Sequence, residues 1–315
     1  MTVRQARHEH QHAIAGLPLV LGGNVFGWTA GEDESFAVLD AFYEAGGRMI
    51  DTADVYSAWV PGHKGGESEA VIGRWLEARG VRGEMRIHTK TGMLGGAELY
   101  APDRVLQSLD ASLERLRTDY VDLYYAHRDY AELAVSDIVA AFDGAARTGK
   151  ARALGASQFT APRLAEALDL AAAQGATPFT VLQNEYNVLN REDFGPELQR
   201  LCAEHGIPMM PYYGLAAGYL TGKYRTPADL EGAARGSRVK DFLARGAPVL
   251  AAMDAVAAET GASLAAIALA WLRAQPGIGA PIASARTPGQ LATLVESTRL
   301  ELSTEQLARL TSATG

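Results

Sequence analysis

Cysteine is nearly absent from this chain of 315 residues, with Cys202 the single example. One thiol can form no disulfide within the chain and supplies no set of thiolate metal ligands. Basic residues are also in the minority, since 29 lysines and arginines face 37 aspartates and glutamates, for a formal net charge of −8. Surfaces that bind nucleic acid show basic patches or stripes. The charge balance therefore argues against nucleic acid and anionic membranes as partners.

Long hydrophobic runs are missing as well. No uninterrupted apolar segment reaches the ~18 residues that would cross a membrane, and residues 1–15 lack the apolar centre of a secretion signal. We therefore expect a cytoplasmic protein. His8, His10 and His12 alternate like the metal-binding pair of some barrel hydrolases, but they precede the first expected strand. We interpret residues 1–16 as a polar tail and predict no metal site.

The chain does contain a regular alternation of short apolar runs and longer segments with helical periodicity, which predicts parallel strands joined by crossover helices. Strands are expected at Pro18–Leu21, Arg48–Ile50, Arg86–His88, Val121–Tyr124, Ala151–Leu154, Thr180–Leu182, Pro208–Met210 and Gly279–Ile282. Helices are expected at Glu34–Ala45, Ser68–Ala78, Pro102–Arg117, Ser136–Thr148, Ala161–Ala173, Phe194–Glu204, Pro248–Thr260, Leu264–Ala274 and Pro288–Ser297.

Eight such strand–helix units fit a single α/β domain, a (β/α)8 TIM barrel over residues 17–315. A doubly wound sheet is the alternative, but its G-x-G-x-x-G fingerprint does not follow the first strand, where Gly22–Gly27 has another spacing. One segment, Lys223–Gly246, is polar and without a clear period. Irregular segments of this length are usually functional or disordered, and we predict a long lid-like loop after the seventh strand.

Four titratable side chains fall at the carboxyl ends of three successive predicted strands. Asp51 and Tyr56 follow the second strand, Lys90 follows the third and His127 the fourth. In a barrel these ends meet at one mouth. A lysine on an interior strand needs a paired charge, which Asp51 can provide, and its ammonium would lower the pKa of a tyrosine from ~10. The set is suited to protonating a carbonyl oxygen, with Tyr56 as general acid and His127 as an aid.

Several motifs resemble those of the aldo-keto reductase family over most of the chain, from about Leu17 to about Leu310. They are Asp51-Thr52-Ala53-Asp54-Val55-Tyr56, Gly66-Glu67-Ser68-Glu69, Thr89-Lys90-Thr91, His127-Arg128, Gln183-Asn184-Glu185-Tyr186-Asn187 and Leu220-Thr221-Gly222-Lys223-Tyr224. The resemblance implies an eight-stranded barrel that reduces aldehydes or ketones with a nicotinamide cofactor bound across its mouth. It also implies that the four side chains named above are the catalytic tetrad.

The same resemblance implies where the cofactor binds. Tyr212 is expected to stack on the nicotinamide ring, and Gln158 and Gln183 to contact its carboxamide. Arg286, just before a helix that begins at Pro288, is placed to contact a 2′-phosphate, which favours NADPH over NADH. The predicted cofactor residues are Gly23, Asn24, Asp51, Ser157, Gln158, Gln183, Tyr212, Gly214, Leu215, Lys223, Ser284, Arg286 and Gln290.

Large apolar side chains after the strands predict a small-molecule pocket at the same mouth. We place Trp28, Met93 and Tyr130 in it, beside the catalytic tyrosine and histidine. Trp59 is the weaker candidate because it lies in a loop rich in glycine and proline.

Three positions depart from the usual family pattern. Gln158 stands in place of an asparagine, Tyr213 of a serine and Leu294 of an asparagine. These departures keep open a second function, in which the protein resembles potassium-channel β subunits and holds the cofactor with little turnover. A metal-dependent barrel hydrolase is a third alternative, which rests only on the N-terminal histidines. The intact tetrad favours an NADPH-dependent oxidoreductase that reduces a small aldehyde or ketone to an alcohol.

Overall fold

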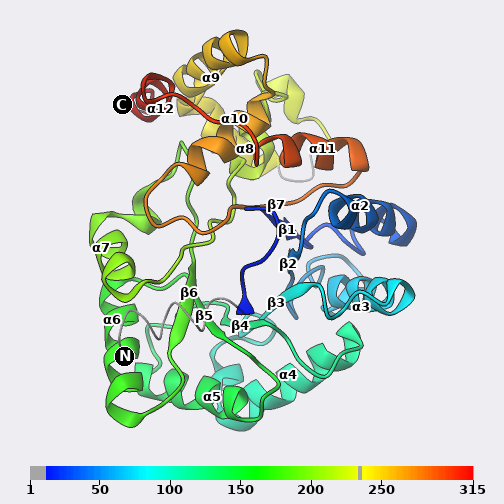
Figure 1. The fold of residues 1–315 in the computed structure, drawn as a ribbon, viewed down its shortest axis with the longest axis vertical. Coiled ribbons are helices and arrows are strands. Elements are labelled where there is room, and N and C mark those ends of the chain that lie inside the picture. Colours follow the sequence, from blue (N-terminus) through cyan, green and yellow to red (C-terminus); the bar gives the residue numbers. More distant parts are fainter. Residues whose placement is uncertain (1–11, 233–235, 315) are drawn as a thin grey trace.

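The computed structural model describes residues 12–232 and 236–314 (Figure 1). In this part of the chain, seven parallel strands form one curled sheet in the order β6-β5-β4-β3-β2-β1-β7. The strands are β1 (Val20–Gly22), β2 (Met49–Asp51), β3 (Arg86–Thr91), β4 (Leu123–Ala126), β5 (Leu154–Ser157), β6 (Phe179–Gln183) and β7 (Ile282–Ala283). The prediction of an α/β fold with parallel strands is confirmed.

One predicted strand, Pro208–Met210, is not a strand in the structure. Met209 makes only isolated parallel bridges, to Leu182 of β6 and to Ile278 ahead of β7. Pro208 and Pro211 have no backbone N–H to donate, so a continuous ladder of hydrogen bonds cannot form here. The segment therefore lies between β6 and the chain that leads into β7, and each of the two contacts is a single bridge.

Several other strands begin later in the chain than predicted. β4 and β5 each start two or three residues late because Val121 and Ala151 pair only in an isolated bridge. The shift matters for function. Asp51, Ser157 and Gln183 are the last residues of their strands, rather than residues of the loops that follow.

Helices cover the outside of the sheet, as expected for parallel strands with crossover connections. They are α2 (Glu32–Glu44), α3 (Glu67–Arg79), α4 (Pro102–Leu116), α5 (Val135–Arg147), α6 (Ala161–Gln174), α7 (Pro196–His205), α8 (Gly236–Arg245), α9 (Ala247–Thr260), α10 (Leu264–Arg273), α11 (Pro288–Glu296) and α12 (Thr304–Ser312). Figure 1 shows α2 to α7 around the strands and α8 to α12 gathered at one end.

The prediction that Lys223–Gly246 lacks secondary structure is wrong for its described residues. The segment contains a short 3-10 helix, Pro227–Leu230, and the helix α8. The helix buries Val239 and Phe242, and the ring of Phe242 stacks on Tyr219 with centroids 6.1 Å apart. Val239, Phe242 and Leu243 have the i, i+3, i+4 spacing of an amphipathic helix, which is the signal that the prediction misses.

Helix α12 was also absent from the prediction, although its start carries a local signal. Ser303 and Gln306 form a reciprocal capping box at its N-terminus. Only Leu310 is buried among its residues, so a hydrophobic stripe is lacking. The helix packs against α9.

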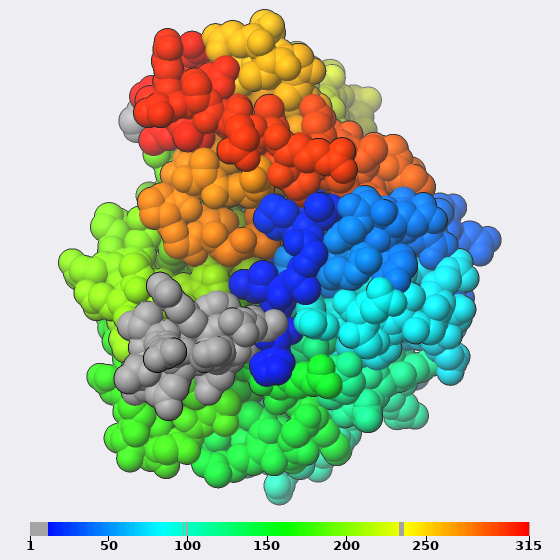
Figure 2. Space-filling model, in the orientation of Figure 1, coloured from blue at the N-terminus to red at the C-terminus, as the bar shows by residue number. Residues whose placement is uncertain are grey.

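Apolar side chains on the inner face of the sheet form a core of their own, which reaches into the predicted tail. Ala13 is fully buried in it, and its carbonyl oxygen lies 2.8 Å from His88 Nε2. His8 and His10 lie outside the described residues. Figure 2 shows residues near the start of the chain against those after α10 on one face. In the described chain no single helix could cross a membrane, and α9 and α10 reach that length only together, across a 97° bend.

Candidate active site

A buried lysine connects the second and third strands at the carboxyl end of the sheet. Lys90 Nζ donates hydrogen bonds to Asp51 Oδ2 at 2.6 Å, to Thr52 O at 2.8 Å and to Tyr56 Oη at 3.0 Å. A lysine ammonium has three N–H donors, so all three are used. The side chain points to the inner face of the sheet because residues alternate between faces along β3.

Burial and charge act in opposite directions on this lysine. Burial lowers the pKa of the Lys90 ammonium, and the adjacent Asp51 carboxylate counteracts that shift. Lys90 is 0% and Asp51 1% exposed, so the pair is shielded from water. A buried charge of this kind is retained only when it is paired and hydrogen-bonded, as it is here.

The second oxygen of Asp51 is held from the far side of the sheet. Gln183 Nε2, at the end of β6, donates to Asp51 Oδ1 at 3.0 Å. A neighbouring glutamine, Gln158, has left-handed backbone geometry with φ of 60°, and its Nε2 donates to His127 O at 3.0 Å. Both amide groups, expected to contact a cofactor, therefore also fix residues of the tetrad.

His127 completes the group of four. Its ring centroid lies 6.1 Å from that of Tyr56, and the side chain is buried. Burial, reinforced by the positive charges of Lys90 and Arg128, holds the pKa of His127 well below its usual value. The imidazole is therefore neutral at pH 7 and can donate one hydrogen bond without carrying charge.

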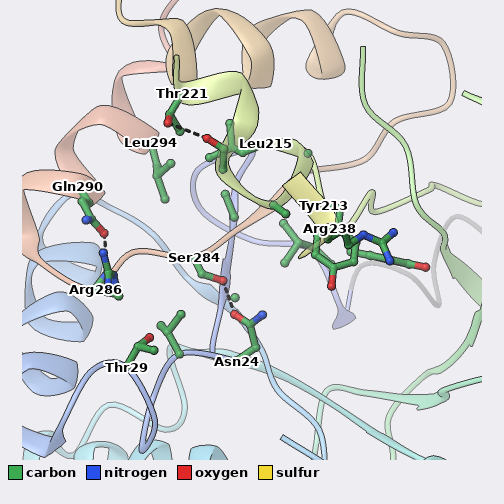
Figure 3. A pocket seen from close by; sticks show the side chains of 18 of the residues that line it. Asn24, Thr29, Tyr213, Leu215, Thr221, Arg238, Ser284, Arg286, Gln290 and Leu294 are labelled. Atoms are coloured by element: carbon green, nitrogen blue, oxygen red, sulfur yellow. Dashed lines mark hydrogen bonds between the residues drawn. The ribbon is translucent and has the colours of Figure 1, made fainter. Parts of the chain in front are cut away.

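A pocket of about 900 Å³ opens above these four residues (Figure 3). Most of the predicted site residues line it: Asn24, Trp28, Asp51, Tyr56, Met93, His127, Ser157, Gln158, Gln183, Tyr212, Gly214, Leu215, Lys223, Ser284, Arg286 and Gln290. Gly23, Lys90 and Tyr130 are not among the lining residues. Lys90 lies beneath the surface of the pocket, and the hydroxyl of Tyr130 donates to Gly92 O.

Gly23 supports the pocket from behind. Its N–H donates to Asp51 O at 2.7 Å, which fixes the start of the loop after β1 to the end of β2. A side chain there would collide with Ser68, since a Cβ would lie 2.8 Å from Ser68 Oγ. The glycine therefore permits close packing beneath the site.

One end of the pocket is formed by the segment from β7 to α11. Ser284 Oγ donates to Asn24 Oδ1 at 2.6 Å, and the backbone N–H of Arg286 donates to Gln290 Oε1 at 2.9 Å (Figure 3). Thr287 caps the start of α11 by accepting a hydrogen bond from the backbone of Gln290. Leu294, one turn further on, also lines this end.

Next to this end lies the segment between Tyr212 and α8. Arg238 of α8 forms an ion pair with Glu185, and its guanidinium lies 4.4 Å from the ring centroid of Tyr213. Tyr213 has a left-handed backbone with φ of 54°, and its ring lies beside Tyr212 with centroids 5.3 Å apart. Figure 3 shows Arg238 and Tyr213 side by side at the edge of the pocket. Arg238 is absent from the predicted site residues because the prediction has a loop where the structure has α8.

The opposite end of the pocket is aromatic. Trp28 and Trp59 meet edge to face with ring centroids 5.4 Å apart, and Trp59 lies 6.2 Å from Tyr56. Trp59 is 49% exposed and lines the pocket. Arg128, which is not among the predicted site residues, lines this part as well, and its position directly after His127 is the signal in the sequence.

The strand ends thus carry a tyrosine held against a buried lysine–aspartate pair, beneath a pocket lined by aromatic and cationic side chains. This combination on a barrel-like parallel sheet is typical of enzymes that act on small organic molecules. The sequence model of the Aldo/keto reductase family matches residues 18–314, and the chain belongs to that family. It is accordingly an oxidoreductase, from a family that generally uses NAD(P)H.

Several characterised or named relatives are similar over most of their length. "Norsolorinic acid reductase stcV" of Emericella nidulans is 31% identical over 325 residues, which cover 95% of this chain and 79% of the relative. "Aryl-alcohol dehydrogenase [NADP(+)]" of Phanerodontia chrysosporium is 31% identical over 89% of this chain and 75% of its own. "Aldo-keto reductase str7" of Strobilurus tenacellus is 32% identical over 79% of this chain and 72% of its own.

Proposed function

We propose that the protein is an NADPH-dependent reductase that converts the carbonyl group of a small aldehyde or ketone to an alcohol. The observation that carries the proposal is the position of Lys90 Nζ, 2.6 Å from Asp51 Oδ2 and 3.0 Å from Tyr56 Oη. A tyrosine held against a buried, paired ammonium is equipped to release its proton, since the ammonium stabilises the phenolate that remains. The name of one relative, which includes NADP(+), supports the choice of cofactor.

Each of the four residues of the tetrad has a separate role in carbonyl reduction. The carbonyl oxygen lies between Tyr56 and His127, where the neutral imidazole donates a hydrogen bond to it. Tyr56 gives its proton to the oxygen as negative charge develops there, and Lys90 stabilises the phenolate. Asp51 keeps Lys90 charged and oriented. The hydride is supplied by the reduced nicotinamide when NADPH is bound.

The pocket fits such a cofactor in size and in charge. Its volume of about 900 Å³ exceeds what a small aldehyde needs, and Tyr212 offers an aromatic face near the tetrad. Lys223, Arg238 and Arg286 bring positive charge to the same end of the pocket for the phosphates. Arg286 precedes the N-terminus of α11, which adds backbone donors and favours a 2′-phosphate.

Two structural features complete this proposal. We infer that residues 216–232 and 236–245 close over the pyrophosphate as a lid, since Lys223 and Arg238 both lie on them and line the pocket. We also infer that Pro208–Met210, bridged to β6 and to Ile278 ahead of β7, takes the place of the eighth strand in a closed barrel. Both inferences place the cofactor across the mouth of one domain.

The aromatic end of the pocket favours a substrate with an aromatic ring. Trp28 and Trp59 present ring edges and faces next to Tyr56, and aromatic pairs of this geometry add to the free energy of burial. One relative is named as an aryl-alcohol dehydrogenase, which supports an aromatic substrate. We therefore propose aryl aldehydes and ketones as the substrate class.

Substitution of the proposed acid tests the mechanism. Tyr56→Phe removes the hydroxyl and should lower kcat for benzaldehyde by about 10² to 10⁴, while NADPH binding is kept. Tyr130→Phe is the matched control, since Tyr130 does not line the pocket and donates to Gly92 O. NADPH oxidation and cofactor fluorescence are measured for both. Unchanged turnover in Tyr56→Phe would refute the mechanism, and tight NADPH binding with negligible wild-type turnover would favour a regulatory cofactor-binding role.

The choice of cofactor has its own test. Arg286→Ala should weaken NADPH binding about tenfold, with little change for NADH, because only NADPH carries the 2′-phosphate. Fluorescence titration gives both dissociation constants. Equal wild-type affinities for the two cofactors would contradict the proposed preference.

A further inference from the structure

Arg128 occupies a fixed position on the substrate side of the pocket. It directly follows His127, its side chain is exposed, and it lines the same pocket as the tetrad. The buried hydroxyl of Tyr100 clamps its backbone, since it donates to Arg128 O at 2.8 Å and accepts from Arg128 N at 3.1 Å. The backbone of Arg128 is therefore held in place, while its guanidinium extends into the mouth of the pocket.

The guanidinium of Arg128 has no partner of opposite charge among the residues that the structure describes. The neighbouring carboxylate, Asp129, is already taken: Arg163 approaches both of its oxygens, at 2.7 to 3.0 Å. Asp51, the carboxylate on the floor of the pocket, is neutralised by Lys90. A cation beside the reaction centre is thus left for a ligand.

The other pocket cations have a different place and a different proposed task. Lys223, Arg238 and Arg286 lie on the segments after β6 and β7, which the proposed function assigns to the cofactor. Arg128 lies after β4, on the same side as Met93 and the tryptophan pair. A guanidinium and an aromatic wall in one pocket match a flat ring that carries an anionic substituent, and the planar fork of arginine suits a carboxylate.

We propose that the preferred substrate is an aromatic aldehyde or ketone with a carboxylate on the ring, away from the carbonyl group, and that Arg128 binds this carboxylate. The ring lies against Trp28 and Trp59, and the carbonyl oxygen lies between Tyr56 and His127. This inference rests on the proposed carbonyl reduction and adds the chemical class of substrate and the residue that selects it.

Paired substrates test the inference. 4-Carboxybenzaldehyde and 4-methylbenzaldehyde differ in charge but have similar size, and we expect wild type to prefer the carboxylate by about tenfold in kcat/KM. Arg128→Ala should bring the ratio of the two kcat/KM values close to one, mainly through a higher KM for 4-carboxybenzaldehyde. Arg128→Lys should recover part of it because it keeps the charge and loses the fork. Arg200→Ala, which removes an exposed arginine on α7 outside the pocket, is the control for net charge.

Salt and product binding separate this inference from the proposed function. The preference should shrink in 0.5 M NaCl, where exposed charges are screened. Binding of 4-(hydroxymethyl)benzoate and of 4-methylbenzyl alcohol to the NADP⁺-loaded protein, followed by tryptophan fluorescence, needs no turnover. Tighter binding of the carboxylate that is lost in Arg128→Ala supports the inference. Equal binding, or an equal loss of both substrates in Arg128→Ala, overturns it, whereas a wild type that reduces neither aldehyde overturns the proposed reaction.

Discussion

The floor of the pocket, which contains Asp51 and Lys90, and its rim, which contains Trp59 and Arg128, differ in how their polar and charged groups are paired. On the floor, Lys90 is 0% and Asp51 1% exposed, and each of their polar groups meets a partner from the protein. On the rim, Trp59 is 49% exposed and Arg128 stands in solvent. The floor neutralises its charges internally, so it can hold a proton donor in one geometry. The rim leaves charge and apolar surface for ligands, so it can change selectivity without loss of the fold.

The largest expected effect is the loss of the floor's cation. Lys90→Met leaves the carboxylate of Asp51 buried and unpaired, which should lower the free energy of unfolding by about 3–5 kcal/mol and abolish most activity. Lys150→Met breaks an exposed ion pair with Asp110 that has the same length of 2.6 Å. The side chains of Lys150 and Asp110 are 39% and 49% exposed. That change should cost less than ~1 kcal/mol. Urea unfolding measures both, and equal losses would erase the contrast between buried and exposed charge.

A second buried carboxylate makes the floor sensitive to pH. Asp54 accepts a hydrogen bond from Thr91 Oγ1 at 2.6 Å, and burial raises the pKa of Asp54 from 3.8 to about 7. The folded state therefore holds this proton more tightly than the unfolded chain does. Its contribution to stability is complete below pH 3.8 and is lost as the pH rises to about 7.

Asp54→Asn removes that titration. Relative to the variant, wild type should lose on the order of 3 kcal/mol of unfolding free energy between pH 4 and pH 8. The difference between the two proteins is the quantity to follow, because His88 and His127, whose pKa values burial lowers, gain stability as the pH rises toward 6.5. Asp229→Asn on the rim is the control. Parallel curves for wild type and Asp54→Asn would contradict the assignment.

Breaking the ion pair between Glu185 and Arg238, on the proposed lid, should moderately increase the rate at which the cofactor dissociates. Glu185→Gln removes the partner of Arg238 and loosens α8 from the end of β6, so NADPH should dissociate about fivefold faster, equivalent to ~1 kcal/mol. Asp254→Asn is matched to it, since it breaks the pair of Arg225 with α9 and leaves the link to the sheet intact. Stopped-flow fluorescence gives the rates. Identical rates in the two variants would show that the link to the sheet has no part in release.

The smallest expected effect comes from the half-exposed tryptophan. Trp59→Phe keeps an aromatic ring next to Trp28 and removes part of the contact area, so KM for benzaldehyde should rise about two- to threefold at constant kcat. Propanal, which lacks a ring, should be unaffected. A fall in kcat instead would mean that Trp59 acts on the floor through Tyr56.

Local patterns in the sequence were sufficient to place the floor. The carboxyl ends of parallel strands must share one edge, so Asp51, Lys90 and His127 could be brought together from the strand pattern alone. Pairing of Asp51 with Lys90 follows from the need to neutralise a buried charge. The predicted first residues of β4 and β5 lie two or three residues too early, because isolated bridges and regular ladders have the same sequence pattern.

Features of the rim depend on contacts between distant parts of the chain. The pair of Arg238 with Glu185 joins residues 53 apart, and the local sequence around either residue does not predict that contact. The exposure of Trp59 likewise depends on how its loop packs against the loop that carries Trp28. The amide of Gln183, which is expected to contact the cofactor, also donates to Asp51, a contact that the sequence does not predict. Which partner a polar side chain takes depends on the folded structure and not on the local sequence.

The hydrogen bond between Gln183 and Asp51 has a consequence for folding. It joins residues 132 positions apart in the chain, across the inside of the sheet. Contacts of such long separation form late, after the local helices and neighbouring strands. Refolding protein should therefore regain its helical circular dichroism before it regains turnover, and a nascent chain that ends before β6 cannot assemble the finished floor. The enzyme thus becomes active only when nearly its whole sheet is in place.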